Sequence, residues 1–223
     1  MYRAIYERRD VRSQFVDDPV SDDVLGRLLQ AAHHAPSVGL MQPWSFVLVE
    51  SSALREQVKE AFRRANANAA QLYAGRLRNQ YESVKLEGIL QASINLCVTC
   101  EPQNPRGHGL GRQTMPETAQ YSAVCAVQNL WLAARAEGVG VGWVSIVDPN
   151  ELRVILAIPA NIVPIAYLCL GYTSHFVAQP ELELTRWERR IPLANVLHFD
   201  RYGVRNDRRA DALGAAPNHH RRD

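Results

Sequence analysis

Three arginines lie within five residues near the start of the chain, in the segment ERRDVRSQF at positions 7–15. They are Arg8, Arg9 and Arg12, and Asp10 lies among them. The planar fork of an arginine side chain matches the oxygens of a phosphate, so such a cluster can hold a phosphorylated ligand. If the segment is helical, Arg8 and Arg12 share a face and Asp10 points away from it. A charged run is more often a solvated surface turn, so the segment alone leaves both interpretations open.

A second candidate site is the loop SVGLMQPW at 37–44. Gln42 offers both the donor and the acceptor that recognition of a flavin or base edge requires. Ser37 could bond a ribityl or phosphate oxygen. The alternative is an ordinary connection in which Trp44 packs in the core, and these residues do not decide between the two.

The third candidate is GVGVGWVS at 138–145, with three glycines at alternate positions. It ends a helix and begins a strand, which is the reverse of the dinucleotide-binding fingerprint. We interpret Gly138 as a helix cap. Gly140 and Gly142 would let a flat ligand approach the backbone closely, and Ser145 would present a hydroxyl to that ligand.

No metal or redox site is predicted. Cys97 and Cys100 have CxxC spacing, but positions three apart on a strand point to opposite faces. His33 and His34 end a helix, where a cation suits the helix dipole. No spacing of acidic or histidine partners supports metal ligation by either histidine.

The composition sets broad bounds on the class of protein. The chain has 223 residues, 47% of them apolar and 22% charged, and a formal net charge of +2. This charge gives no argument for nucleic acid or a membrane surface as a partner. No apolar run reaches the roughly 20 residues of a spanning helix, and MYRAIYERRD is not a signal segment. Cysteines without a disulfide framework favour a reducing compartment, so we expect a cytoplasmic protein.

Periodicity and capping signals predict the elements that must position these residues. Helices are expected at 21–34, 52–90 with a break near Gly75, 117–137 and 150–156, and strands at 46–49, 94–99, 139–147 and 164–170. The helix at 117–137 is apolar nearly all round, which indicates burial in a large core or a dimer interface. The long loop at 101–116 is typical of a lid.

The C-terminal part carries fewer core signals. Residues 182–197 are expected to form an extended arm, in which Arg186, Arg189 and Arg190 are surface charges or one of them reaches a phosphate. We expect one α+β domain over 1–202 and a disordered tail over 203–223.

Four segments in this order resemble the nitroreductase superfamily of flavin proteins. The likeness is greater to its 5,6-dimethylbenzimidazole synthase, or flavin destructase, branch, and it runs from about residue 4 to 197. The segments are RRDVRSQF, AAHHAPSVGLMQPWSF, VKLEGILQASINLCVTC and TAQYSAVCAVQNLWLAARAEGVGVGWVSI. The first two are fairly specific to the branch, and the glycine-rich part belongs to the wider superfamily.

This resemblance implies a mixed sheet flanked by helices, in a homodimer with exchanged arms and two FMN sites at the interface. It assigns the FMN phosphate and ribityl chain to Arg8, Arg9 and Arg12. The flavin would be bordered across the interface by Ser37, Met41 and Gln42. Further expected contacts are Lys85 and Leu86 on a helix near the ring or ribityl chain, the strand Gly142–Ser145 at the reactive edge of the ring, and Arg186 on the arm.

The implied reaction is oxygen-dependent fragmentation of reduced FMN. The products are 5,6-dimethylbenzimidazole, the lower ligand of cobalamin, and erythrose 4-phosphate, so FMN is a substrate and dioxygen a co-substrate. NAD(P)H is the expected upstream electron source, and a separate flavin reductase is a further expected partner. Asp10 and Ser145 match the aspartate and serine that the branch uses. A carboxylate among arginines can serve as a base or an orienting group.

Two other functions compete with this one. The first is an FMN-dependent NAD(P)H nitroreductase that keeps FMN intact as a cofactor, and the second is a flavin-binding carrier without turnover. Asp10 and Ser145 argue against the first, because a plain hydride shuttle needs neither. A carrier would need no lid.

Overall fold

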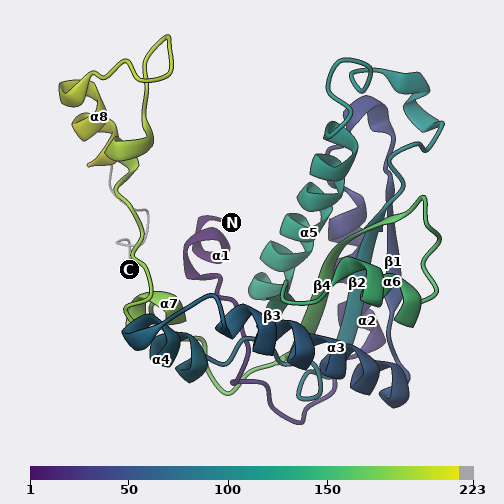
Figure 1. The fold of residues 1–223 in the computed structure, drawn as a ribbon. Helices are drawn as coiled ribbons and strands as arrows, with labels where there is room; N and C mark the ends of the chain where they lie inside the picture. The colour runs from purple at the N-terminus through teal and green to yellow at the C-terminus, as the bar shows by residue number, and fades with distance from the viewer. Residues whose placement is uncertain (216–223) are drawn as a thin grey trace.

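Four strands form one antiparallel sheet in the computed structural model of this chain, which describes residues 1–215. The strand order is β1-β2-β4-β3, and each neighbouring pair runs antiparallel (Figure 1). The strands are β1 (Trp44–Leu48), β2 (Ile94–Cys100), β3 (Val139–Val144) and β4 (Val163–Tyr172). The prediction of an α+β fold is confirmed.

The two faces of the sheet carry separate hydrophobic cores, because side chains alternate along each strand. Leu96 and Cys100 on β2 belong to one core, whereas Cys97 belongs to the other. The two cysteines therefore face opposite sides, as predicted. Burial raises the pKa of Cys97 to about 12 and that of Cys100 to about 11, so both thiols remain protonated at neutral pH.

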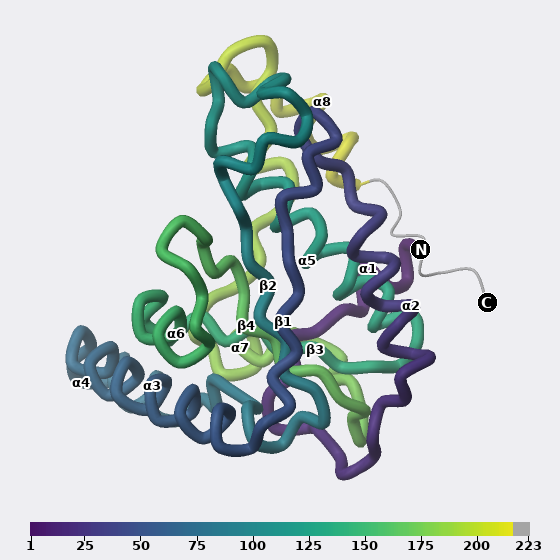
Figure 2. Tube along the Cα trace, turned by 90° about the vertical axis from the view of Figure 1, so that its right-hand side faces the viewer, coloured from purple at the N-terminus to yellow at the C-terminus, as the bar shows by residue number. Residues whose placement is uncertain are grey.

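Helices cover both faces of the sheet (Figure 2). On the first face lie α2 (Asp22–His33) and α5 (Thr118–Ala136), and on the second lie α3 (Ser52–Ala70) and α6 (Pro149–Ile155). The hydroxyl of Ser21 accepts a hydrogen bond from the Val24 amide and caps α2, as the sequence predicts. No helix among the described residues is both long enough and apolar enough to cross a bilayer.

The helical region expected at 52–90 is shorter in the structure. It consists of α3 and α4 (Gly75–Ser83), and the chain leaves helical geometry at Val84. The cause is a buried carboxylate: Glu87, 5% exposed, accepts a hydrogen bond from the Ile89 amide and pairs with Lys59. A helix through these residues would remove that carboxylate from its partners.

The arginine-rich segment is extended rather than helical. The first helix, α1 (Tyr2–Glu7), ends before it, and Arg8 has φ −58° and ψ 136°. Asp10 then forms an isolated parallel bridge with Val141 of β3, and Phe15 forms an antiparallel bridge with Thr173. We expected a mixed sheet, with both parallel and antiparallel pairing. The four strands pair antiparallel, and the Asp10 bridge adds a parallel contact at β3.

The glycines of β3 allow this segment to dock. A Cβ added at Gly142 would lie 2.2 Å from the backbone oxygen of Val11, and one at Gly140 would lie 2.9 Å from Val11 Cγ2 and 2.4 Å from Thr173 Cγ2. We expected a flat ligand to use the space that the missing side chains leave. In the structure the chain itself fills it.

The arm and the end of the chain contain short helices. They are α7 (Glu181–Leu184), the 3-10 helix η3 (Leu193–Val196) and α8 (Asp207–Gly214). The expected extended arm thus has a helical turn at each end. We expected disorder from residue 203 onward, but residues 207–214 form the helix α8. Residues 216–223 of the expected tail lie outside the described part. In Figure 1, η3 and α8 stand away from the sheet, and Arg205 joins them by donating to the carbonyl groups of Ala194, Asn195 and Leu197.

The contact between Gly142 and Val11 can be tested by substitution. We expect Gly142→Ala to lower the free energy of unfolding by about 1–3 kcal/mol, because a backbone oxygen cannot move aside as a flexible side chain can. Gly26→Ala is the matched control, since nothing lies within 4 Å of an added Cβ there and Gly26 lies inside α2. It should raise the free energy of unfolding by about 0.5–1 kcal/mol.

Urea denaturation of both variants and of the wild type measures these changes. An unchanged stability of Gly142→Ala would contradict the close docking of the N-terminal segment on β3.

Candidate functional site

A cavity of about 180 Å³ lies between the arginine-rich segment and the arm. Four of its lining residues are arginines and two carry carboxylates. The lining consists of Arg8, Arg9, Asp10 and Arg12 from the N-terminal segment, and Pro180, Glu181, Leu182 and Arg190 from the arm. We call this cavity the arginine pocket. The structure therefore brings the three predicted arginines together around one space.

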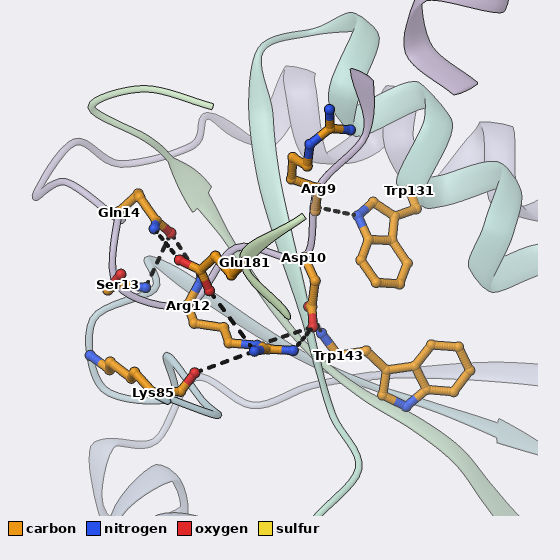
Figure 3. Close-up of polar contacts among 9 residues, drawn as sticks. All are labelled: Arg9, Asp10, Arg12, Ser13, Gln14, Lys85, Trp131, Trp143 and Glu181. Atoms are coloured by element: carbon orange, nitrogen blue, oxygen red, sulfur yellow. Dashed lines mark hydrogen bonds and ion pairs between the residues drawn. The ribbon is translucent and has the colours of Figure 1, made fainter. Parts of the chain in front are cut away.

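Asp10 links the arginine pocket to the sheet. Its Oδ1 accepts a hydrogen bond of 2.9 Å from the Trp143 amide, and its Oδ2 accepts two from Arg12, at 2.6 Å from Nη2 and 3.1 Å from Nε (Figure 3). Bonds from a guanidinium to a carboxylate are among the stronger hydrogen bonds in proteins. A carboxylate oxygen has about two acceptor positions, so Oδ1 keeps one for a further donor.

Arg12 is held from several sides. Besides its contacts with Asp10, its Nη1 donates to the backbone oxygen of Lys85 at 3.4 Å and lies 3.9 Å from Glu181 Oε2 (Figure 3). The Arg12 side chain is only 12% exposed. In this structure, Arg12 therefore holds the Asp10 carboxylate in its position.

Arg8 and Arg9 are the other two arginines of the N-terminal segment in this pocket. The Arg8 guanidinium lies 4.6 Å from the centre of the Trp131 ring, and both η nitrogens of Arg9 donate to backbone oxygens. Arg9 Nε is buried and has no hydrogen-bond partner among residues 1–215. Burial lowers the pKa of Arg8 and of Arg9, and the neighbouring charge of Arg190 lowers both further. The cations around this space outnumber the two carboxylates, which favours the binding of an anion.

The predicted flavin loop lies elsewhere. Near the start of α5, the Val38 amide donates to the Ser122 hydroxyl, whereas near its end the Trp131 indole donates to the backbone oxygen of Arg9. Ser122 and Trp131 are nine residues apart, which is on the order of 13 Å along a helix. The arginine pocket and the loop at 37–42 therefore occupy opposite ends of α5 within one chain.

The loop at 37–42 is closely tied to the loop at 101–116. Gln42 has a left-handed φ of 47°, its amide donates to the Ser37 hydroxyl, and its Oε1 accepts a hydrogen bond from Arg106 at 3.2 Å. Met41 is buried at 1% exposure. Gly39 and Gly107 pack so closely that a Cβ on Gly107 would lie 2.5 Å from the Gly39 oxygen. The predicted lid thus lies against the Ser37–Gln42 loop.

Ser145 follows directly after β3 and is exposed. It lines a second cavity, of about 200 Å³, together with Trp143, Pro149 and Pro164 among others. Two strand residues span roughly 6.6 Å. Ser145 therefore lies no further than about this distance from Trp143, whose amide Asp10 contacts.

Three further predicted contacts are placed differently. Lys85 and Leu86 follow α4 rather than lying on a helix, and the backbone oxygen of Lys85 accepts a hydrogen bond from Arg12. The Leu86 side chain packs against the second core. Arg186 lines a neighbouring surface hollow with Arg189, whereas Arg190 reaches the arginine pocket.

Comparisons with known proteins show the family to which the chain belongs. The Nitroreductase family model matches residues 5–172. A protein of Rhodospirillum rubrum named 5,6-dimethylbenzimidazole synthase is 46% identical over 185 residues, which cover 83% of this chain and 87% of that protein. A Rhodobacter capsulatus protein of the same name is 41% identical over 185 residues, covering 83% and 89%. A putative NADH dehydrogenase/NAD(P)H nitroreductase of Archaeoglobus fulgidus is 30% identical, covering 76% and 83%.

Solved structures support the same fold. The crystal structure of oxidized iodotyrosine deiodinase bound to FMN and 3-iodo-L-tyrosine matches with a TM-score of 0.70 at 22% identity, covering 91% of this chain and 98% of that one. A nitroreductase family protein from Clostridium difficile matches with a TM-score of 0.65 at 17% identity, covering 90% and 98%. With a family model across most of its length and relatives well above 30% identity, this chain belongs to the nitroreductase family.

Proposed function

We propose that this protein is a 5,6-dimethylbenzimidazole synthase, which fragments reduced FMN with dioxygen to 5,6-dimethylbenzimidazole and erythrose 4-phosphate. The observation that carries the proposal is Asp10, a carboxylate held between Arg12 and the Trp143 amide at the wall of an arginine pocket. The relatives of that name, at 46% and 41% identity, support it.

The charges of the arginine pocket suit the phosphate of FMN. Its four guanidinium groups and two carboxylates leave two positive charges, and a phosphomonoester carries about −1.5 to −2 at neutral pH. Arg9 Nε is a buried donor that has no hydrogen-bond partner in the described part of the chain, and buried donors normally have one. In this proposal Arg8, Arg9 and Arg190 hold the phosphate, while Arg12 keeps Asp10 in place beside the ribityl chain.

The remaining part of the ligand requires a second surface. Ligand pockets usually measure about 300–1,000 Å³, and the arginine pocket has only about 180 Å³. The flavin loop lies at the far end of α5, and α5 exposes apolar side chains there, including Tyr121 at 56% and Val124 at 41%. We propose a homodimer with exchanged arms, in which Ser37, Met41 and Gln42 of a second copy border the flavin.

The chain's own residues would then divide the work. Reduced FMN supplies the reactivity toward dioxygen and the carbon framework of the product. Asp10, through its remaining Oδ1 acceptor position, orients a ribityl hydroxyl or accepts a proton from the ribityl chain. Ser145 donates a hydrogen bond near the ring, and Gly142 keeps the docked segment close to β3. The loop at 101–116 excludes water from the site, and NAD(P)H provides electrons directly or through a separate flavin reductase.

The products of turnover test this function. Protein, FMN and a reductant are incubated in air, and the small molecules are separated by chromatography. We expect 5,6-dimethylbenzimidazole. Intact FMN together with reduction of an added nitroaromatic would instead establish an NAD(P)H nitroreductase. This is the second candidate function, because the Archaeoglobus fulgidus relative is named a putative NADH dehydrogenase/NAD(P)H nitroreductase. Intact FMN without any turnover would indicate a carrier.

Asp10→Asn tests the role of the carboxylate. We expect product formation to fall at least about 100-fold, since a positioned acid or base contributes 10²–10⁴, while FMN still binds. Asp17→Asn is the matched control, because Asp17 is an exposed carboxylate on the same segment. Product formation and FMN binding are measured on both variants. Normal turnover by Asp10→Asn would rule out the assigned role.

Arg9→Ala tests the phosphate site. We expect the Kd for FMN to rise about 10-fold or more, since a charge-assisted hydrogen bond contributes about 1.5–3 kcal/mol. The Kd for riboflavin, which has no phosphate, should change little. Arg63→Ala is the control, because Arg63 is a largely exposed arginine on α3 paired with Glu60. Quenching of flavin fluorescence gives all these constants, and equal weakening for both flavins would contradict a phosphate contact.

A further inference from the structure

We propose that Glu87, through its ion pair with Lys59, positions Asp10 for the proposed reaction. The pair holds residues 84–89, in the connection between α4 and β2, against Arg12, and Arg12 in turn holds the Asp10 carboxylate. This inference rests on the proposed function, because it concerns the group that acts on the ribityl chain. Neither member of the pair belongs to the described residues that line the arginine pocket, so both are positioning residues rather than catalytic ones.

Glu87 is a buried carboxylate with two partners. It is 5% exposed, its Oε1 pairs with the Lys59 ammonium on α3, and its Oε2 accepts a hydrogen bond of 2.8 Å from the Ile89 amide. The Lys59 side chain is 31% exposed, so it reaches this carboxylate from the surface. Because a buried charge is costly unless partners meet it, the pair fastens the middle of the 84–89 segment to α3.

The end of the 84–89 segment is fastened to the sheet instead. Asn95 on β2 donates from Nδ2 to the backbone oxygen of Ile89 at 2.9 Å, and the Tyr167 hydroxyl on β4 donates to Asn95 Oδ1 at 2.9 Å. Asn95 and Tyr167 are both 1% exposed. These buried bonds hold Ile89 independently of Lys59. Loss of the ion pair would therefore loosen the earlier part of the segment while its end stays on the sheet.

That earlier part touches the arginine-rich segment. The backbone oxygen of Lys85 accepts a hydrogen bond of 3.4 Å from Arg12 Nη1 (Figure 3). Gly88 packs so closely that an added Cβ would lie 2.9 Å from the Arg12 backbone oxygen and 2.5 Å from Phe15 Cε2. Glu87 lies between Lys85 and Gly88 in the sequence. Its carboxylate thus fixes the stretch that contacts both the side chain and the backbone of Arg12.

The anchor requires a carboxylate rather than any side chain of similar size. A carboxylate offers two acceptor oxygens, whereas the amide of a glutamine offers one acceptor and one donor group. Both partners of Glu87, the Lys59 ammonium and the Ile89 amide, are donors. Either orientation of an amide at this position would leave one of them facing another donor. Glu87→Gln should therefore release one anchor point at almost unchanged volume.

The test measures kcat and KM for reduced FMN in air, as 5,6-dimethylbenzimidazole formed by the folded full-length protein. We expect Glu87→Gln to lower kcat at least about 10-fold, since a small misplacement of a reacting group can cost on the order of 100-fold. KM should stay within about threefold, because the phosphate-binding arginines are untouched. Glu60→Gln is the matched control, because Glu60 is a carboxylate on α3 that pairs with Arg63 at the surface. It should leave kcat unchanged.

Two substitutions of Lys59 distinguish its charge from the space that it fills. Lys59→Met removes the ammonium and leaves the Glu87 carboxylate buried without its counter-charge, and should lower kcat at least about 10-fold. Lys59→Arg keeps a cation with several donors at a partly exposed position, and should retain about half of the wild-type kcat or more. Because Lys59 is partly exposed, these two variants carry the test if Glu87→Gln does not fold.

Urea denaturation of every variant separates positioning from stability. Val58→Ala is the control for stability, because Val58 is fully buried on the same helix, and its truncation should lower the urea midpoint without changing kcat. The inference is overturned if Glu87→Gln and Lys59→Met lower only the urea midpoint, or if Lys59→Arg is as slow as Lys59→Met. An equal loss of kcat in Val58→Ala also overturns it. In each of these cases the proposed function stands, whereas a wild type that forms no 5,6-dimethylbenzimidazole overturns that function and this inference with it.

Discussion

The docking of Asp10 on β3 is the interaction on which the rest of the site depends. One carboxylate receives the Trp143 amide on one oxygen and the Arg12 guanidinium on the other. The segment can approach so closely only because Gly142 has no side chain to meet the Val11 oxygen. This contact holds the arginine-rich segment against β3, so that its arginines line one side of the arginine pocket. The arm, through Arg9 and Gln14, then supplies the opposite wall.

The helix α5 separates the two regions that were predicted to bind the flavin. It packs on the sheet and on α2, contacts the Ser37–Gln42 loop near its start and contacts the arginine segment near its end. These two regions lie at opposite ends of α5, so one ligand is not expected to contact both regions of the same chain. In the homodimer that we propose, the start of one α5 would lie toward the end of the other, and a symmetric interface of this kind can complete a site.

Local rules predicted much of this fold. The Ser21 cap, the alternation along β2 and the helix stop at Gly138 each depend on residues a few positions apart, so the sequence displays them directly. The arginine cluster and Asp10 were also visible, because adjacency in sequence became adjacency in space. The family was predicted from four sequence segments that occur in the same order as in the nitroreductase superfamily. The family model and the relatives confirm this prediction.

The differences arise from contacts between distant residues. The helix expected to reach residue 90 stops early because Glu87 pairs with Lys59, 28 positions away. The contact of Gly142 with the N-terminal segment was not predicted, because its neighbour Val11 lies more than a hundred residues earlier in the chain. Glu181 escaped notice for the same reason, since its partner Gln14 is 167 positions away. No spacing rule encodes such pairs, and only the tertiary structure reveals them.

The separation of η3 and α8 from the sheet has a consequence for how this protein can vary. Arg205 satisfies three carbonyl groups inside that unit, and Arg209 stacks 5.3 Å from the Phe199 ring. The unit thus draws its cohesion from itself rather than from either core. Substitutions in it and in the cores share no partners, so their effects should add independently. Within one chain, the described part of η3 and α8 can therefore accept substitutions without disturbing the sheet or its glycine-rich strand.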